Sequence, residues 1–245
     1  MADLAEIAKS VESKTGWQVD LDRIRLEVVS GREMSRRAAL DDTRRTGMPS
    51  AEQPIALQRM MGALYDSAYY NRAIAIYLPK EETILLNDQR LNDKSRDAVK
   101  SAVHHELTHA SQHQRHPEFF DALDQCVRDY RRWSKHGSDF PGDEQARQSG
   151  ESLKRIQARM ALLEGQAQVL QGMYEKELGL HSEAKMGPID LALGLTHRFL
   201  GGMRHSIGQY ALGEEIFRRI YQTSMSEVDT LFKQPKLTDV VFEAV

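Results

Sequence analysis

The sequence predicts an α+β fold, in which a small mixed β-sheet is followed by a mainly helical C-terminal part. Three short apolar or alternating runs, at 24–29, 74–78 and 83–86, indicate strands, and all of them precede residue 90. Beyond residue 91, apolar residues recur at spacings of three and four, which is typical of amphipathic helices. Strands and helices segregated along the chain in this way indicate the α+β class. We therefore expect one domain over 1–245, with a mixed α/β part at 1–90 and a helical part at 91–245.

The N-terminal part is expected to contain two helices and three strands. The first helix covers 3–14 and ends near Gly16, because glycine disfavours helix. Residues 30–52 are polar and rich in Arg and Asp, so we expect a long loop or an irregular helix there. A second helix is expected over 54–69, with a proline in its first turn. The last two strands flank the segment 79–82, which predicts a β-hairpin or two neighbouring strands.

The helical part begins with a helix that Asp93 or Ser95 can cap and that ends before Pro117, since the residue before a proline disfavours helix. A polar, glycine-containing loop is expected over 134–150, and Gly179 ends the long helix that follows it. The helix after Pro117 is expected to bury an apolar stripe of Phe120, Leu123, Val127 and Tyr130. The long helix covers 151–178, and two more are expected at 189–200 and 207–221. A last helix opens with the capping box of Ser224 and Glu227.

Composition favours a cytoplasmic protein with neither nucleic acid nor membrane as a partner. The net charge of −3 gives no field that attracts nucleic acid or anionic lipid, and no apolar run approaches the ~18 residues of a membrane span. The single cysteine, Cys126, excludes an internal disulfide and fits a reducing compartment. No secretory signal is visible at the N-terminus. Two arginine-rich stretches have interspersed acidic residues, which favours ordinary solvated surface over a phosphate site; they contain Arg32, Arg36, Arg37, Arg44 and Arg45, and Arg128, Arg131, Arg132 and Lys135.

One motif carries chemistry. His105, Glu106 and His109 form the pattern His-Glu-x-x-His inside the helix expected before Pro117. Residues four apart lie on one face of a helix, so both imidazoles can bind one divalent ion. Glu106 lies one step round the helix and can reach a water on that ion. A chain of this length folds without a structural metal, so an ion here is expected to serve chemistry.

Two imidazoles leave a catalytic zinc ion short of one protein ligand. His113 is four residues beyond His109, but three successive rungs rise ~12 Å along a helix, which one ion cannot span. A histidine six residues after His109 is absent, because Arg115 occupies that position and His116 is displaced by one. We predict Glu164 as the third ligand, since the small residues beside it allow two helices to approach closely. Alternatives for this carboxylate are Glu151, Glu175 and Glu177.

With these residues the chain resembles the gluzincins, zincin-like metallopeptidases in which a helix bearing His-Glu-x-x-His is followed by a helix donating a glutamate, often within Glu-Gly-x-Ala. The similarity extends to Tyr210, Gly213 and Phe217, and to a C-terminal helix with Pro235 and Thr238. Gln166 stands where such proteins often carry Asp. The resemblance implies a zincin-like fold with Zn²⁺ bound by His105, His109 and Glu164.

The expected function is that of a zinc-dependent hydrolase, a metallopeptidase acting on a peptide or protein substrate. Glu106 is the expected general base, and Tyr210 the expected donor to the oxyanion, with His197 and His205 as alternatives. The strand at 74–78 can pair with an extended substrate if it forms the edge of the sheet. Two other functions stay open at this point: a catalytically silent zincin that acts as a protein-binding or regulatory module, and a metal-independent helical interaction protein.

Overall fold

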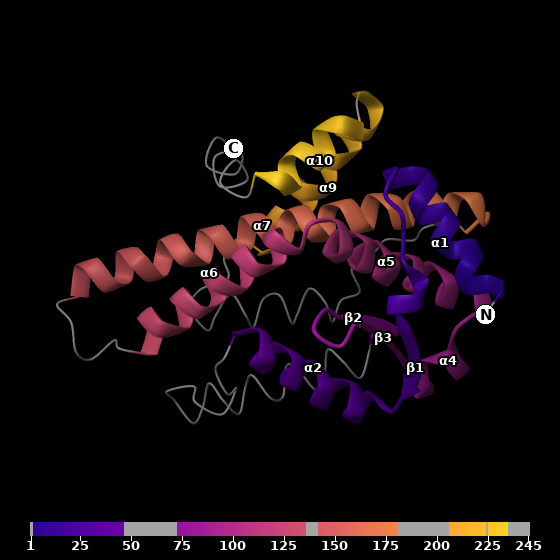
Figure 1. Ribbon diagram of the computed structural model, residues 1–245, viewed down its shortest axis with the longest axis horizontal. Coiled ribbons are helices and arrows are strands. Elements are labelled where there is room, and N and C mark those ends of the chain that lie inside the picture. Colours follow the sequence, from indigo (N-terminus) through magenta and orange to yellow (C-terminus); the bar gives the residue numbers. More distant parts are fainter. Residues whose placement is uncertain (1, 47–72, 136–141, 181–205, 224, 235–245) are drawn as a thin grey trace.

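The chain combines a three-stranded β-sheet with a larger set of helices, in agreement with the predicted α+β class (Figure 1). A computed structural model describes residues 2–46, 73–135, 142–180, 206–223 and 225–234. The helices predicted at 54–69 and 189–200, and Ser224 of the predicted capping box, lie outside these described residues.

The sheet has the order β1-β3-β2, with β1 at Arg25–Val29, β2 at Ala75–Leu78 and β3 at Thr83–Asn87. Strands β2 and β3 form the predicted hairpin, whose antiparallel register pairs Tyr77 with Ile84. Strand β1 runs parallel to β3. Within the described part of the chain, β1 and β2 are therefore the two edges of the sheet.

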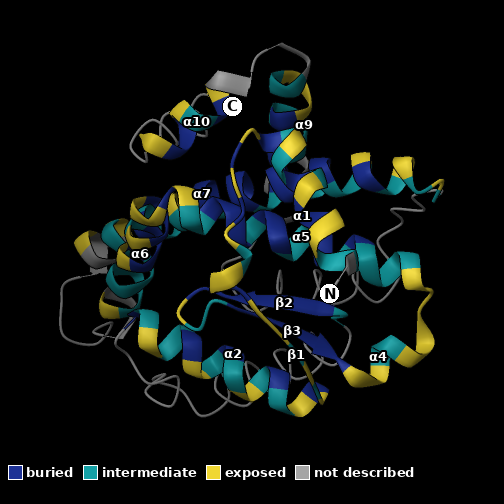
Figure 2. Cartoon of the chain, turned by 45° about the vertical axis from the view of Figure 1, so that its right-hand side comes forward, coloured by how far each residue is buried: buried dark blue, intermediate teal, exposed yellow. Residues whose placement is uncertain are grey.

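Each face of the hairpin strands is covered by helices. Side chains alternate across a strand, so Tyr77 and Ile84 face one side, where they join a core cluster with α1 (Ala2–Thr15) and α5 (Arg96–Arg115). On the other side, Ile76 and Leu85 pack against Met34 of α2 (Gly31–Thr46). Figure 2 shows β2 and β3 in the colour of buried residues, whereas β1 carries exposed residues along its length.

Helix α2 corrects the prediction of a long loop or irregular helix over 30–52, because the described part of this segment is a regular α-helix. It begins after Ser30, whose hydroxyl oxygen accepts a hydrogen bond from the N–H of Glu33 at 3.2 Å. Only one narrow face of it is buried, with Met34, Ala38 and Asp41 at spacings of four and three. That narrow stripe explains why the apolar pattern was too weak to predict the helix.

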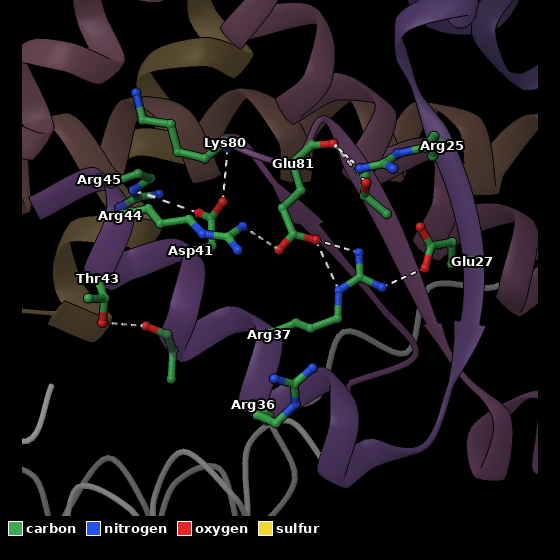
Figure 3. A network of polar contacts seen from close by, with 12 residues as sticks. Arg25, Glu27, Arg36, Arg37, Asp41, Thr43, Arg44, Arg45, Lys80 and Glu81 are labelled. Carbon is green, nitrogen blue, oxygen red and sulfur yellow. Dashed lines mark hydrogen bonds and ion pairs between the residues drawn. The ribbon is translucent and has the colours of Figure 1, made fainter. Parts of the chain in front are cut away.

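Ion pairs fasten α2 to the hairpin (Figure 3). Arg37 pairs with Glu27 of β1 at 2.5 Å and also with Glu81 in the hairpin turn. Arg44 reaches the other oxygen of Glu81 at 2.9 Å. The buried carboxylate of Asp41 accepts a hydrogen bond from the N–H of Lys80 in the same turn at 2.9 Å. These contacts join a polar helix to the sheet by charge as well as by apolar packing.

The helical part is built around α7, which covers Gly142–Glu177 and contacts α5, α6 and α9. This helix corrects the loop predicted over 134–150, because the described residues of that range from Gly142 onward belong to it. Ser95, and not Asp93, caps α5: its hydroxyl accepts from the N–H of Ala98 at 3.2 Å. The other described helices are a 3₁₀ turn at Leu21–Arg23, α4 at Asp88–Asp93, α6 at Pro117–Lys135, α9 at Ser206–Thr223 and α10 at Met225–Lys233.

The helical part has its own apolar core. Phe119 of α6, Leu162 of α7, Phe217 of α9 and Phe232 of α10 are fully buried and belong to one cluster. Among the helices that the structure describes, none has the length and the apolar character needed to cross a bilayer. The prediction of a single domain over 1–245 stays a prediction.

Candidate metal centre

Helix α5 presents both histidines of the motif to α7. It packs on β2 on one side and on α7 on the other, which is why only Arg96 and Arg115, at its two ends, are exposed. His105 and His109 are one helical turn apart, and their side chains retain 16% and 13% exposure. They therefore border solvent, which a substrate or an ion needs in order to reach them.

The carboxylate of Glu164 on α7 faces both imidazoles. The Nε2 atoms of His105 and His109 lie 3.1 Å apart. The Glu164 oxygens lie 3.4 Å from Nε2 of His105 and 3.5 Å from Nε2 of His109. Around a tetrahedral zinc ion with ligand bonds of ~2.0–2.1 Å, neighbouring ligand atoms are ~3.3 Å apart. Each of the three separations is close to that value, with one oxygen of Glu164 near each imidazole.

Two glycines form a close helix contact at the residue next to Glu164 in the sequence. Gly165 on α7 and Gly213 on α9 pack backbone against backbone: a Cβ on Gly165 would lie 2.4 Å from the carbonyl carbon of Gly213. A Cβ on Gly213 would in turn lie 2.1 Å from the backbone oxygen of Ala161. The close approach predicted from the small residues beside Glu164 is therefore found between α7 and α9, and not between α7 and α5, the helix that carries the two histidines.

The charges of His109 and Glu164 stabilise each other. Burial alone raises the pKa of Glu164, but the two imidazoles outweigh burial and hold its pKa far below the usual range. Burial alone lowers the pKa of His109, but the Glu164 carboxylate dominates and raises it to about 9. In the absence of an ion, His109 and Glu164 therefore form an imidazolium–carboxylate pair at neutral pH. A divalent cation bound by the three groups would take the place of that proton.

Glu106 is held at the edge of the sheet. Its Oε2 accepts a hydrogen bond from the backbone N–H of Tyr77 on β2 at 2.7 Å. Burial raises the pKa of Glu106, and the negative charge of Glu164 adds to the effect, while His105 and His109 oppose it. A carboxylate with a raised pKa accepts a proton more readily, which suits a general base.

Two glutamines that the sequence analysis did not single out contact the imidazoles. Gln171 of α7 lies 2.9 Å from Nδ1 of His105, and Gln112 of α5 lies 2.8 Å from Nδ1 of His109. A helical spacing argument could have found both, since Gln112 follows His109 by three residues and Gln171 follows Glu164 by seven. Tyr77 was also missed as the donor to Glu106. The donor is its backbone N–H, which nearly every residue type has, so the sequence does not indicate this contact.

The other candidate ligands have different partners. His113 is bound at Nδ1 by the hydroxyl of Tyr77 at 2.9 Å, and the buried His116 lies 3.2 Å from Asp229. Neither belongs to the cluster of potential ligand atoms, which among the described residues contains only His105, His109 and Glu164. The alternative carboxylates are likewise paired elsewhere: Glu151 with Arg147, Glu175 with Ser101, and Glu177 with Lys14.

The predicted oxyanion donor lies in α9, but the side chain of Tyr210 is outside what the structure describes. The alternatives His197 and His205, and the C-terminal residues Pro235 and Thr238, also lie outside the described residues. The structure thus brings together His105, His109, Glu164 and Glu106, and metal binding by the first three stays a prediction.

Comparisons of the chain with protein-family models, with curated proteins and with solved structures found no match. The resemblance to gluzincins therefore depends on the motif and on the geometry of the three ligands.

Proposed function

We propose that this protein is a zinc-dependent hydrolase of the zincin kind, and that it cleaves peptide bonds. The observation that supports this most directly is the convergence of two imidazole nitrogens and one carboxylate at separations of 3.1, 3.4 and 3.5 Å, on two different helices. Glu106 lies next to one of these ligands in sequence and is held by the sheet edge. This combination has the donor set of a His₂Glu catalytic zinc site.

The donor set favours zinc over harder cations. Mg²⁺ and Ca²⁺ take six or more oxygen ligands, whereas two imidazoles and one carboxylate suit a borderline ion such as Zn²⁺. Three protein ligands leave a coordination position for water, as in catalytic sites. His105, His109 and Glu164 would hold the ion.

The reaction is a hydrolysis in which Glu106 moves the proton. A zinc ion held there would polarise the scissile carbonyl and make a neighbouring water more acidic. Glu106 accepts the proton of that water as the oxygen attacks the carbonyl carbon, and it then delivers the proton to the amide nitrogen as the C–N bond breaks. The N–H of Tyr77 keeps the carboxylate of Glu106 in place during both transfers.

The substrate class follows from strand β2. This strand is an edge of the described sheet, and its residue Tyr77 contacts Glu106 directly. An extended peptide that pairs with an edge strand gains backbone hydrogen bonds and is laid alongside the catalytic groups. We therefore propose an extended peptide or protein segment as the substrate, with Tyr210 as the donor to the oxyanion. The single cysteine fits a reducing compartment, and on that basis we propose a cytoplasmic location.

The test is the variant Glu106→Gln, examined for both zinc content and peptide cleavage. Removing a general base should lower turnover by ~10²–10⁴-fold, while the ligands still bind about one zinc per chain. Metal is measured by elemental analysis, and cleavage by mass spectrometry of a diverse peptide library incubated with each protein. Glu6→Gln on the exposed side of α1 is the matched control and should cleave like the wild type.

Three results would contradict the proposal in different ways. Wild-type protein without stoichiometric zinc would exclude the metal centre. Zinc-loaded wild type that cuts nothing in the library would favour the silent, partner-binding zincin. Full activity of Glu106→Gln would exclude Glu106 as the base.

A further inference from the structure

A glutamine contacts each candidate histidine ligand at Nδ1, the ring nitrogen that does not face Glu164. Nδ1 of His105 lies 2.9 Å from Oε1 of Gln171, and Nδ1 of His109 lies 2.8 Å from Oε1 of Gln112. An imidazole nitrogen can donate or accept in such a contact, depending on its tautomer. The tautomer therefore depends on which end of each amide faces the ring.

The amide of Gln171 can face His105 only with its oxygen. Its Nε2 donates to the carboxylate of Glu175 at 3.1 Å and to the hydroxyl of Ser101 at 2.8 Å. Ser101 gives its own proton to Glu175 at 2.5 Å, so its oxygen is left to accept from Gln171. Turning the amide round would place its oxygen against the carboxylate of Glu175, which has no proton to donate.

The amide of Gln112 is fixed in the same way. Its Nε2 donates to the backbone oxygen of Leu163 at 3.0 Å and to Oε1 of Gln166 at 2.8 Å. Gln166 turns this oxygen toward Gln112 because its own Nε2 donates to the hydroxyl of Tyr221 at 2.8 Å. Gln112 and Gln166 are fully buried, so water cannot replace these contacts. A backbone oxygen only accepts, and the oxygen of Gln112 must therefore face His109.

Both imidazoles must then donate from Nδ1, which leaves Nε2 of each ring free to bind an ion. We propose that Gln112 and Gln171 are positioning residues of the metal centre, which fix the tautomer and the ring orientation of His109 and His105. This inference rests on the proposed zinc site and extends it. Each glutamine also bridges α5 and α7: Gln112 reaches Leu163 and Gln166 on α7, and Gln171 reaches Ser101 on α5. The same contacts thus set the spacing between the helices that supply the ligands.

The experiment removes one amide while keeping its shape. Gln171→Met should lower zinc affinity by ~10–100-fold, the usual effect of losing a hydrogen bond to a ligating histidine. Affinity is measured by competition with a chromogenic chelator. In zinc-loaded wild type, proton NMR should show slowly exchanging Nδ1–H signals from both rings, and the His105 signal should be lost or exchange rapidly in Gln171→Met. Gln168→Met on the same helix, which none of the contacts above involves, is the control and should leave both measurements unchanged.

A charge-neutral swap tests rescue. The double variant Gln171→Glu/Glu175→Gln returns an acceptor oxygen to His105 and keeps the number of charges, so zinc affinity should recover to within about threefold of the wild type. This threefold range is an order-of-magnitude expectation for a hydrogen bond that is kept but repacked. Gln112→Met tests the contact with His109 in the same zinc-affinity assay. Because the amide of Gln112 is buried, thermal unfolding is measured as well, to check that the variant is folded.

The outcomes separate this inference from the proposed function. Folded Gln171→Met and Gln112→Met proteins that bind zinc as tightly as the wild type, with both Nδ1–H signals intact, would overturn the positioning role alone. Weakened zinc binding with rescue by the swap, in a protein that cleaves no peptide, would support positioning and overturn the hydrolase. Wild type that binds no zinc would overturn both.

Discussion

At the residue scale, His109 should link the proposed zinc binding to the release of a proton. The carboxylate of Glu164 raises the pKa of His109 to about 9, so the ring is protonated at neutral pH when no ion is bound. Zinc must displace this proton, and apparent zinc affinity should therefore rise ~10-fold per pH unit from pH 7 until the pH reaches the pKa. We expect release of about one proton per zinc at pH 7.5, measured by calorimetry in buffers of different ionisation enthalpy.

The variant Glu164→Gln provides the comparison for this proton. Without the carboxylate, the pKa of His109 falls, so little proton is released at pH 7.5 even where high zinc concentrations still drive binding. Equal proton release by the two proteins would show that Glu164 does not hold the proton on His109.

His104 makes the metal-free protein sensitive to acid. This ring is fully buried, stacks on Tyr174, and burial lowers its pKa to about 3. The unfolded chain takes up the proton below a pKa of ~6.5, whereas the folded chain does not until near pH 3, so stability falls as the pH drops through this window. Between pH 7.5 and 5.5 this single group should cost about 1.4 kcal/mol of unfolding free energy.

Urea unfolding in the presence of a chelator, at both pH values, measures that loss. The variant His104→Leu keeps an apolar side chain in the site and should lose less stability over the same interval, by about 1.4 kcal/mol. An identical pH dependence in wild type and variant would exclude His104 as the acid-sensitive group.

At the scale of residues, the sequence predicted which candidate ligands come together better than it predicted the contacts that support them. His105, Glu106 and His109 follow from helical spacing within one helix, and Glu164 from the small residues around it. Helical spacing places Gln112 and Gln171 near the two histidines, but it does not say which end of each amide faces the ring, because that depends on partners across the helix contact and so on how α5 and α7 are rotated against each other. That rotation is set by packing over many residues and not by a local pattern.

At the scale of elements, the contact between α7 and α9 should tolerate no added methyl group. A Cβ on Gly165 would meet the backbone of Gly213 at 2.4 Å, and backbone cannot move aside as a side chain can. Gly165→Ala should therefore lower the unfolding free energy by about 1–3 kcal/mol, as overpacking does. It should also weaken zinc binding, because Glu164 is the neighbouring residue. Urea unfolding and chelator competition measure the two effects.

Gly172→Ala is the matched control on the same helix. A Cβ there meets nothing within 4 Å, so the substitution should add about 0.5–1 kcal/mol of stability through the lower flexibility of alanine. Destabilisation by both substitutions to a similar extent would contradict the close helix contact at Gly165.

The elements that the sequence failed to predict share a physical cause. Helix α2 has few apolar residues and is held by ion pairs of Arg37 with Glu27 of β1 and with Glu81 of the hairpin turn, and a hydrophobic pattern does not report such pairs. The first turns of α7 contain Gly142 and Gly150, residues that normally indicate a loop. The hairpin and the helix that carries His-Glu-x-x-His were predicted because their apolar residues alternate or recur with a clear period.

At the scale of the whole molecule, removing the metal should leave the fold intact. The described apolar cores lie on both faces of the sheet and between α6, α7, α9 and α10, and none of them includes a candidate ligand. Protein treated with a chelator should therefore keep its helical circular dichroism and unfold cooperatively. Adding zinc at 100 times its dissociation constant should raise stability by about 2.7 kcal/mol, seen as a higher Tm. Loss of helical signal on chelation would show instead that the ion is structural.

Helix α7 supplies Glu164, Gln166 and Gln171 from a single rod of 36 residues, ~54 Å long at ~1.5 Å per residue. Glu164 and Gln171 are seven residues apart and therefore lie within about 20° of each other around the helix axis, whereas Gln166 is turned by about 160° from Glu164. One residue inserted between Ala158 and Glu164 would rotate the helix after the insertion by about 100° relative to the helix before it. Either the carboxylate of Glu164 would then point away from the histidines, or the apolar face of α7 would point away from its neighbouring helices. Insertion of four residues would restore the phase to within about 40° but would lengthen the rod by about 6 Å. Homologues that keep this centre should consequently vary in length outside this stretch of α7 and keep its residue count fixed.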